Sequence, residues 1–269
     1  MKKVLIVGGT HGNEWTGAYV VQKHEKQIKA RFPDLDLHFI FGNPEAFKIS
    51  KRFKDEDLNR AFQFLHEDRP NSFEHHRARE IKAQIDQEPC FVIDLHTTTS
   101  NMGKTIILCH ENKLNLFVAE KAAKNVKDCR VVLSPDPKRK YLVSQSDFGM
   151  MIEVGPIANS IVNGKVLEET LEILEDILTS LSMPVENGNL DVYEEIQDLS
   201  YPENSFIHPK FQDQDFIPLL GEYCPFKTYQ GEEIQHKTTE VLFPIFINEA
   251  AYYSQNLAFT LCRKRNLNF

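Results

Sequence analysis

The strongest constraint on the fold lies at the start of the chain, where a short apolar run leads directly into two glycines. Residues 4–14 read VLIVGGTHGNE, so the aliphatic run ends at Val7 and the glycines are followed by His11 and Glu14. A run of this length and composition is typical of a buried β-strand, and the glycines allow a tight loop at its carboxyl end. In open α/β sheets, ligands bind in the crevice at this end of the strands. We therefore expect His11 and Glu14 to lie at the functional edge of a sheet.

Apolar runs and helical patterns alternate along the first two thirds of the chain. Further strands are predicted at residues 37–41, 90–95, 106–109, 131–133 and 150–154, and helices at residues 15–30, 71–87, 114–126 and 166–181. The last of these helices has the clearest repeat of apolar residues at every third or fourth position. Alternation of this kind predicts an α/β fold with helices on both faces of a sheet.

The composition changes after about residue 184. Proline, glycine, aromatic residues and short alternating runs, such as residues 190–193 and 241–247, become frequent there. These features indicate a mostly β unit. We therefore predict two domains, an α/β domain over residues 1–184 and a smaller, mostly β domain over residues 185–269.

Charge and cysteine content limit the partners and the compartment of the protein. The formal net charge is −8, and no run of lysines and arginines suggests a nucleic-acid surface. The apolar run after Met1 is far shorter than the core of a signal peptide, and nothing indicates a membrane protein. Five dispersed cysteines without a Cys-x-x-Cys pair fit reduced thiols in a cytoplasm better than a disulfide framework. We expect a cytoplasmic protein without a nucleic-acid or membrane partner.

A second histidine at a strand end completes a possible set of metal ligands. His96 follows the apolar run 90–95 directly, much as His11 follows the first run. Two histidines and one carboxylate are a ligand set of catalytic zinc, which keeps a further position for water. Either histidine alone could be a hydrogen-bonded structural residue, but packing does not readily explain the joint pattern. We predict that His11, Glu14 and His96 hold one zinc ion per chain.

Two carboxylates are candidates for supporting roles at this site. Asp94 stands two residues before His96 and is expected on the same side of the strand. It could fix the tautomer of the imidazole, or it could be an ordinary buried and paired aspartate. Glu153 ends the apolar run MMIEV, where burial would raise its pKa toward neutrality, as a proton shuttle requires. The alternative for Glu153 is a structural glutamate in a salt bridge.

A densely charged segment, residues 51–60, follows the predicted strand at 37–41. The segment shows no clear period, so one interpretation is a solvated loop. The other is a binding loop, because binding residues are often carried by loops that a scaffold positions.

Six segments resemble the aspartoacylase family, a branch of the zinc carboxypeptidase-like fold that also includes succinylglutamate desuccinylase and the aromatic type of aminoacylase. They are GGTHGNE (8–14), DEDLNR (55–60), DLHTTTSNMG (94–103), IEVGP (152–156), HPKFQDQDF (208–216) and FINEAAYY (246–253). The segments occur in the right order over nearly the whole chain. The resemblance implies a mixed central sheet flanked by helices, with a mostly β C-terminal domain that covers the active-site cleft.

The resemblance also implies an activity and its catalytic residues. The expected enzyme is an amidohydrolase that converts an N-acyl-L-amino acid, in the first place N-acetyl-L-aspartate, into a carboxylate and a free amino acid. In the family pattern His11, Glu14 and His96 hold the zinc, and Glu153 is the general base that later passes its proton to the leaving amine. Arg52 matches the arginine that polarises the scissile carbonyl and stabilises the oxyanion.

Three more residues match the family's substrate-binding positions. Asn59 and Arg60 match a pair that contacts the substrate, and the arginine is suited to hold a carboxylate. Tyr252 matches a tyrosine that the C-terminal unit supplies to the same carboxylate. Family likeness further suggests a dimer or a higher oligomer.

One segment departs from the family pattern. In aspartoacylases proper, a second arginine shortly before the general base reads the side-chain carboxylate of aspartate. Residues 140–148 of this chain read KYLVSQSDF, and the nearby Arg139 and Lys140 would match only in a shifted alignment. An N-acyl derivative of a neutral or aromatic amino acid therefore stays open as the substrate, as does an activity like that of succinylglutamate desuccinylase.

Two other functions agree less well with these residues. A dinucleotide-binding enzyme would carry the fingerprint G-x-G-x-x-G, whereas Gly8, Gly9 and Gly12 have the wrong spacing. An inactive binding protein on the same fold would be expected to lack a metal ligand or the base, yet all of these residues are present. Metal analysis of the purified protein would separate both alternatives from a metal-dependent enzyme.

Overall fold

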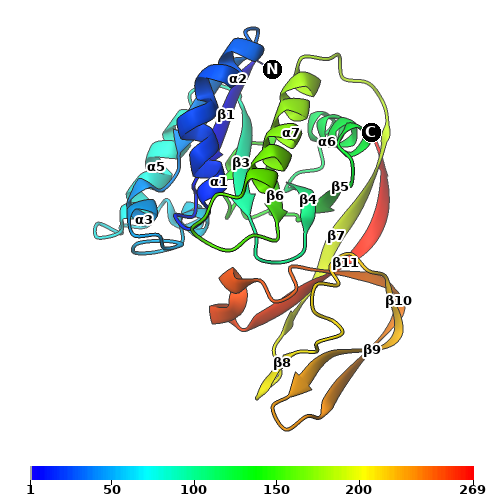
Figure 1. Ribbon diagram of the computed structural model, residues 1–269. Coiled ribbons are helices and arrows are strands. Elements are labelled where there is room, and N and C mark those ends of the chain that lie inside the picture. Colours follow the sequence, from blue (N-terminus) through cyan, green and yellow to red (C-terminus); the bar gives the residue numbers. More distant parts are fainter. Residues whose placement is uncertain (1) are drawn as a thin grey trace.

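The computed structural model describes residues 2–269 and is organised around a mixed sheet (Figure 1). The strand order is β2-β1-β3-β6-β4-β5-β7-β11-β10-β9-β8. Strands β1, β2, β3 and β6 are parallel to one another, whereas β4 is antiparallel to β6. The predicted α/β class with a mixed central sheet is therefore confirmed. The strands of the N-terminal part are β1 (Lys3–Gly8), β2 (Asp36–Phe41), β3 (Phe91–Thr97), β4 (Gly103–Leu108), β5 (Cys129–Leu133) and β6 (Gly149–Gly155).

Alternate residues of β1 pack into hydrophobic cores on opposite faces of the sheet. Val4 and Ile6 belong to a core that includes residues of α6 and α7, and Leu5 and Val7 to one that includes residues of α4 and α5. Helices therefore cover both faces, as the alternating pattern predicted. The helices of this part are α1 (Trp15–Tyr19), the π-helix η1 (Val20–His24), α2 (Glu25–Arg31), α3 (Pro44–Lys48), α4 (Leu58–Ala61), η2 (Phe62–Phe64), α5 (Phe73–Ile85), α6 (Lys113–Asn125), η3 (Val143–Gln145) and α7 (Gly164–Leu181).

Three local predictions differ from the structure. The helix predicted at 15–30 is interrupted by the π-helical turn η1, which apolar spacing does not distinguish from α-helix. The short helix α3 was not predicted, although Asn43 caps it through Ala46 N and a proline occupies its first position. Strand β3 extends to Thr97, so that His96 lies within the strand and not after it.

The C-terminal part is mostly β, as predicted. Its elements are β7 (Asn189–Ser200), β8 (Ser205–Ile207), β9 (Leu219–Thr228), β10 (Glu233–Ile245), the short 3-10 helix η4 (Ala250–Gln255) and β11 (Leu257–Asn268). Strand β7 pairs with β5 on one side and with β11 along nearly its whole length on the other. The two strands run from the helical part into the β-rich part in Figure 1. The predicted domain boundary at residue 184 falls in the segment between α7 and β7.

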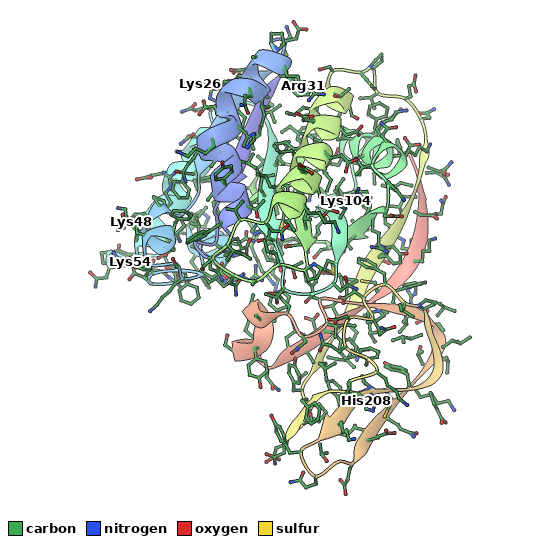
Figure 2. The ribbon with its side chains drawn as sticks, viewed as in Figure 1. Lys26, Arg31, Lys48, Lys54, Lys104 and His208 are labelled. Atoms are coloured by element: carbon green, nitrogen blue, oxygen red, sulfur yellow. The ribbon has the colours of Figure 1, made fainter. Side chains whose placement is uncertain are left out.

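Charged side chains of helix α7 form ion pairs with residues of α2 and β4. Arg31 Nη1 lies 2.5 Å from Glu175 Oε2, and Lys104 Nζ lies 3.0 Å from Glu172 Oε2 (Figure 2). Exposed pairs of this kind contribute little to stability. Within residues 2–269 all five cysteines are free, and no helix is both long and apolar enough to span a bilayer.

Candidate active site

Two glycines bring helix α1 into direct contact with the end of β1. A Cβ atom on Gly8 would lie only 2.1 Å from the backbone oxygen of Gly17, so this close approach depends on the missing side chain. The next residue, Gly9, has a φ of 72°, a conformation that favours glycine and turns the chain sharply after the strand. The turn places His11 beside Glu14, which is the N-cap residue of α1.

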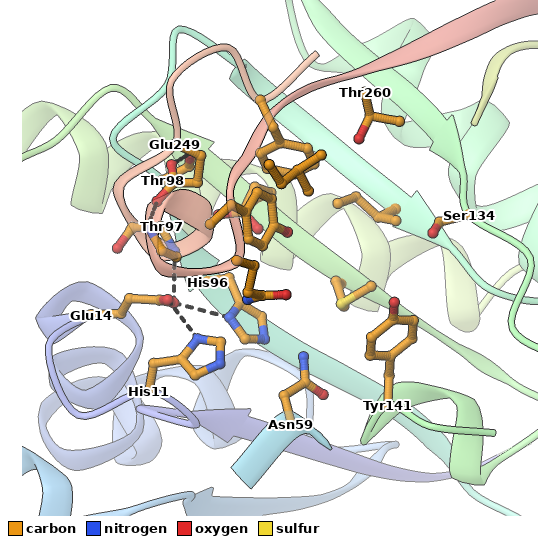
Figure 3. A pocket seen from close by; sticks show the side chains of 18 of the residues that line it. His11, Glu14, Asn59, His96, Thr97, Thr98, Ser134, Tyr141, Glu249 and Thr260 are labelled. Atoms are coloured by element: carbon orange, nitrogen blue, oxygen red, sulfur yellow. Dashed lines mark hydrogen bonds and ion pairs between the residues drawn. The ribbon is translucent and has the colours of Figure 1, made fainter. Parts of the chain in front are cut away.

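His11, Glu14 and His96 converge on one point (Figure 3). The Nδ1 atom of His11 lies 2.6 Å from Glu14 Oε1, and the Nδ1 atom of His96 lies 2.9 Å from Glu14 Oε2. One possible ligand atom from each of the three residues lies within 4.8 Å of the other two, and all three side chains are buried. This arrangement could hold a metal ion between two imidazole nitrogens and a carboxylate.

An outer carboxylate orients each histidine. Asp94 Oδ2 lies 2.7 Å from His96 Nε2, and Asp94 Oδ1 accepts a hydrogen bond of 2.6 Å from Thr10 Oγ1. Asp57 Oδ1 lies 3.2 Å from His11 Nε2. A carboxylate at Nε2 fixes the tautomer that leaves the Nδ1 lone pair for a metal. The position of Asp94 agrees with the expected one, whereas the sequence did not single out Asp57.

The carboxylate of Glu14 carries a negative charge. Burial would raise the pKa of Glu14, but the adjacent His11 and His96 lower that pKa well below its ordinary value. The pKa of Asp57 is likewise well below its ordinary value. Burial would raise this pKa, but His11, Arg52 and Arg60 lower it. Two anionic carboxylates beside buried imidazoles favour a bound cation.

Glu153 is placed beside His96 by the register of the sheet. Strands β3 and β6 are parallel neighbours, and Glu153 is paired with His96, so both side chains project to the same side. Glu153 is buried, and none of the hydrogen bonds within residues 2–269 involves its carboxyl group. Burial raises the pKa of Glu153 well above its ordinary value, although His96 and Arg52 oppose this shift. A structural salt bridge, the alternative considered for this residue, is not formed among the described residues.

The charged segment 51–60 contributes side chains to the same site. Arg52 Nε donates to Asp57 Oδ2 at 2.9 Å, so that one aspartate links Arg52 to His11. Asp57 also caps helix α4 through Asn59 N at 2.9 Å. A solvated loop was therefore the wrong interpretation for residues 57–60, because Asn59 is buried and Asp57 is mostly shielded from water.

The two predicted substrate-binding residues of this segment extend from the short helix α4. Asn59 Oδ1 accepts a hydrogen bond of 2.9 Å from Leu142 N. The guanidinium of Arg60 lies 4.5 Å from the ring centre of Tyr141. Within residues 2–269 Arg60 has no carboxylate at ion-pair distance, whereas Arg52 has two, Asp57 and Glu14.

Tyr252 comes from the C-terminal part, and a buried glutamate fixes the segment that carries it. Glu249 Oε2 accepts hydrogen bonds from Thr98 Oγ1, from Thr99 N at 2.8 Å and from Thr99 Oγ1 at 3.0 Å. Glu249 Oε1 caps helix η4 through Ala251 N at 3.0 Å. Burial raises the pKa of Tyr252 far above its ordinary value, so its hydroxyl group is a neutral donor. Glu249 lies in the segment 246–253 that resembles the family, but nothing in the sequence indicates its contact with Thr98 and Thr99.

One pocket brings the predicted site residues together. Its volume is about 260 Å³, and all eight residues that the sequence predicted for metal binding, catalysis and substrate binding line it. In Figure 3 the histidines and Glu14 point toward one another, while Ser134 and Thr260 lie on the opposite side of the pocket. Arg139 is not among the lining residues, because it donates to Ser144 O at 3.0 Å and pairs with Asp147.

The fold and the pocket together define the class of protein: a site with the ligands of a hydrolytic metal centre and a buried carboxylate, at the carboxyl end of a mixed α/β sheet. A family model described as "Succinylglutamate desuccinylase/Aspartoacylase catalytic domain" matches residues 1–181, and an "AstE/AspA barrel-sandwich hybrid domain" matches residues 188–264. The chain belongs to the succinylglutamate desuccinylase/aspartoacylase family.

Individual relatives agree with this assignment over the full length of the chain. The chain is 34% identical over 291 residues to a probable aspartoacylase of a Nostoc species, a match that covers 100% of this chain and 98% of that protein. It is 33% identical to the aspartoacylase of Rattus norvegicus, with 100% and 94% covered, and 30% identical to an N-acyl-aromatic-L-amino acid amidohydrolase (carboxylate-forming) of Danio rerio, with 98% and 93% covered. The crystal structure of murine aminoacylase 3 superposes with a TM-score of 0.91 at 27% identity, covering 100% of this chain and 96% of that one. These named relatives are hydrolytic enzymes.

Proposed function

We propose that the protein is a zinc-dependent amidohydrolase that cleaves an N-acyl-L-amino acid into a carboxylate and a free amino acid. The observation that carries the proposal is the convergence of His11, Glu14 and His96 beside the buried Glu153 in one pocket. Membership of the family, with its named deacylating enzymes, supports the same reaction. A cytoplasmic location and a dimeric or larger assembly stay predictions from the sequence.

The donor set fits zinc. Imidazole nitrogens and a carboxylate oxygen are ligands that zinc accepts, and each imidazole has an outer carboxylate at its second nitrogen. Three protein ligands also leave a position for a water molecule. A zinc ion held there would supply a Lewis acid and lower the pKa of that water.

Glu153 is proposed as the proton carrier. Its carboxylate accepts a proton from the attacking water and later gives that proton to the nitrogen of the leaving amine, so that one group serves both half-reactions. Burial raises the pKa of Glu153, which makes the carboxylate a stronger base than an exposed glutamate.

Arg52 is proposed to stabilise the negative charge that develops on the carbonyl oxygen. Its guanidinium is held by Asp57 through Nε and by Glu14 through Nη1, and among the described residues Nη2 has no partner. A cation fixed in this way needs no reorganisation when charge develops on the substrate.

Arg60, Asn59 and Tyr252 are proposed to bind the α-carboxylate of the substrate. Arg60 has no ion pair among the described residues and is stacked on Tyr141, which leaves its donors available for a carboxylate. Because Arg52 is already paired twice, the pocket offers one cation for one substrate carboxylate. This count favours an N-acyl amino acid with an uncharged or basic side chain over N-acetyl-L-aspartate, which carries two carboxylates.

We further propose that residues 1–184 form the catalytic domain and that residues 185–269 form a domain that covers the cleft. The pocket lining supports this division, because the metal ligands and Glu153 come from the first part. Tyr252 and Glu249 come from the second part.

The test combines metal analysis with a hydrolysis assay. The purified protein is expected to contain one zinc ion per chain and to release acetate from at least one N-acetyl-L-amino acid. Glu153→Gln is expected to keep the metal and to lower kcat by about 100-fold or more, because a general base contributes to the rate and not to metal binding. Glu240→Gln is the matched control, since Glu240 is exposed and paired with Arg263. Near-normal turnover in Glu153→Gln would refute the assigned role.

A further inference from the structure

We infer that the pocket selects N-acyl amino acids whose side chain ends in a cationic amine, and that Glu195 and Asp198 are the residues that recognise it. This inference rests on the proposed function and names its substrate class. It concerns the wall of the pocket opposite the metal site, which consists of Ser134, Glu195, Asp198 and Thr260 and is called the acidic wall below.

The charges in the pocket are distributed unevenly. Of the two arginines that line it, Arg52 is paired with Asp57 and Glu14, and Arg60 is proposed to hold the α-carboxylate. Among the residues that the structure describes, no other lysine or arginine lines the pocket. Within residues 2–269 no cation lies at ion-pair distance from Glu195 or Asp198. The acidic wall therefore has two carboxyl groups without a cationic partner, in the same pocket as the proposed reacting groups.

The hydroxyl groups of the wall hold both carboxylates in place. Ser134 Oγ donates to Glu195 Oε2, and Thr260 Oγ1 donates to Asp198 Oδ1 at 2.7 Å. The second oxygen of Glu195, Oε1, accepts no hydrogen bond from the described residues. Burial raises the pKa of Glu195 to about 7, because the carboxylate is shielded from water and has one donor. A bound ammonium group would supply the missing donor and the missing counter-charge.

The strand order places this wall on the far side of the pocket from the predicted metal ligands. The metal ligand His96 lies on β3, and the sheet continues through β6, β4 and β5 to β7, which carries Glu195. Neighbouring strands are roughly 4.8 Å apart, so four spacings, roughly 19 Å, separate the backbones of β3 and β7, and an extended substrate must bridge this span together with the side chains that line the pocket. Met151 on β6 and Ile107 on β4 line the pocket between them and are paired in the sheet. The route thus offers apolar contacts for methylene groups and then a carboxylate for the terminal amine.

The α-carboxylate site directs the side chain along this route. Arg60 is close enough to Glu195 for its charge to lower the pKa of that carboxyl group, against the larger effect of burial. The side chain of an amino acid is bonded to the same carbon as its α-carboxylate. A substrate held by Arg60 with its acyl carbonyl at the metal site therefore has its side chain free to extend toward the acidic wall.

The experiment compares substrates that differ only in the terminal amine. Acetate release by the purified, zinc-loaded protein is measured with Nα-acetyl-L-lysine and with N-acetyl-L-norleucine, which has the same carbon chain without the amine. N-acetyl-L-aspartate and N-acetyl-L-phenylalanine complete the panel. We expect kcat/KM for the lysine compound to exceed that for the norleucine compound by at least about tenfold, the usual size for a single ionic contact that is partly desolvated.

Variants then locate the selectivity. Glu195→Gln is expected to lower kcat/KM for the lysine compound about tenfold and to leave the norleucine compound within about twofold, because only the charge is removed. Asp198→Asn is expected to act in the same direction and less strongly, since Asp198 is exposed. Glu194→Gln is the matched control, because Glu194 is the neighbouring carboxylate on β7 and is paired with Arg265 outside the pocket.

The outcomes separate this inference from the proposed function. Equal or faster hydrolysis of the norleucine, phenylalanine or aspartate compound would overturn the inference and leave the amidohydrolase intact. If Glu195→Gln lowers kcat/KM equally for the lysine and norleucine compounds, the inference is also overturned, because such a result would assign Glu195 a structural role. No acetate release from any compound would overturn the proposed function itself.

Discussion

Replacing Glu249 with glutamine tests how the C-terminal part is held on the active site. One oxygen of the carboxylate accepts from Thr98, twice from Thr99 and twice from Ser100, and the other accepts from Ala251 N. A glutamine has only one accepting oxygen. Whichever way the amide is oriented, its NH₂ group must face a backbone or hydroxyl donor that the carboxylate now satisfies.

The expected loss of stability follows from these contacts. Of the five hydrogen bonds to that oxygen, the three from Thr98 and Thr99 are the shortest. These three stop being charge-assisted, at about 1 kcal/mol each, and a buried amide faces the N–H of Ala251 at a further cost of about 1 kcal/mol. We expect the free energy of unfolding to fall by about 4 kcal/mol, since Glu249 is buried. Because Glu249 caps the helix that carries Tyr252, KM should rise as well.

Urea unfolding followed by tryptophan fluorescence measures the first effect, and steady-state kinetics the second. Glu240→Gln is again the control, because that exposed carboxylate is paired with Arg263 at the surface and its loss should leave the stability nearly unchanged. A double-mutant cycle with Thr98→Val isolates the contact between the two residues. If Glu249→Gln unfolds at the same urea concentration as the wild type and keeps its KM, the contact does not hold the two parts together.

Three further predictions concern single residues. Arg60→Ala should raise KM by roughly tenfold or more with a smaller change in kcat, because it removes the proposed carboxylate partner; steady-state kinetics with an unchanged KM would place the carboxylate elsewhere. Asp94→Asn should weaken metal binding by about 10- to 100-fold, since His96 loses its outer carboxylate. Competition with a chelator measures the metal affinity, and an affinity equal to that of the wild type would show that Asp94 does not support metal binding through His96. Burial raises the pKa of Asp215 from 3.8 to about 6, so the folded protein loses stability as the pH rises through this range, by about 3 kcal/mol in all. Asp215→Asn keeps an acceptor for Ile247 N and should therefore be more stable than the wild type at pH 8 and nearly equal to it at pH 4. Urea unfolding at the two pH values checks the sign, and a constant difference would contradict it.

The part of the site that lies at strand ends could be predicted from local sequence. His11, His96 and Glu153 each stand at or beside the end of an apolar run, and the sheet topology brings such positions to one edge. Arg52, Asn59 and Arg60 have no such local signal, because a charged segment looks the same in a solvated loop and in a pocket. Their roles were predicted only through the resemblance to a family.

Other contacts depend on residues far apart in the chain. Glu249 and Thr98 are separated by 151 positions, and Asp57 and His11 by 46. Neither pair has a spacing or a composition that would indicate its partner. The acidic wall is a further example, because the pairing of β7 with β5 brings the strand that carries Glu195 beside the N-terminal strands. The fold had to be known before these carboxylates could be assigned to one site.

The paired strands β7 and β11 also limit how the pocket can admit its ligands. Their antiparallel pairing extends from Asn189 to Ser200 of β7, with two shifts of register, and so runs from the helical part into the β-rich part. A swinging motion of one part against the other would have to distort this pairing. We therefore expect substrates to enter and products to leave through small movements of side chains and of helix η4. The helical part and the β-rich part are expected to keep a constant orientation relative to each other.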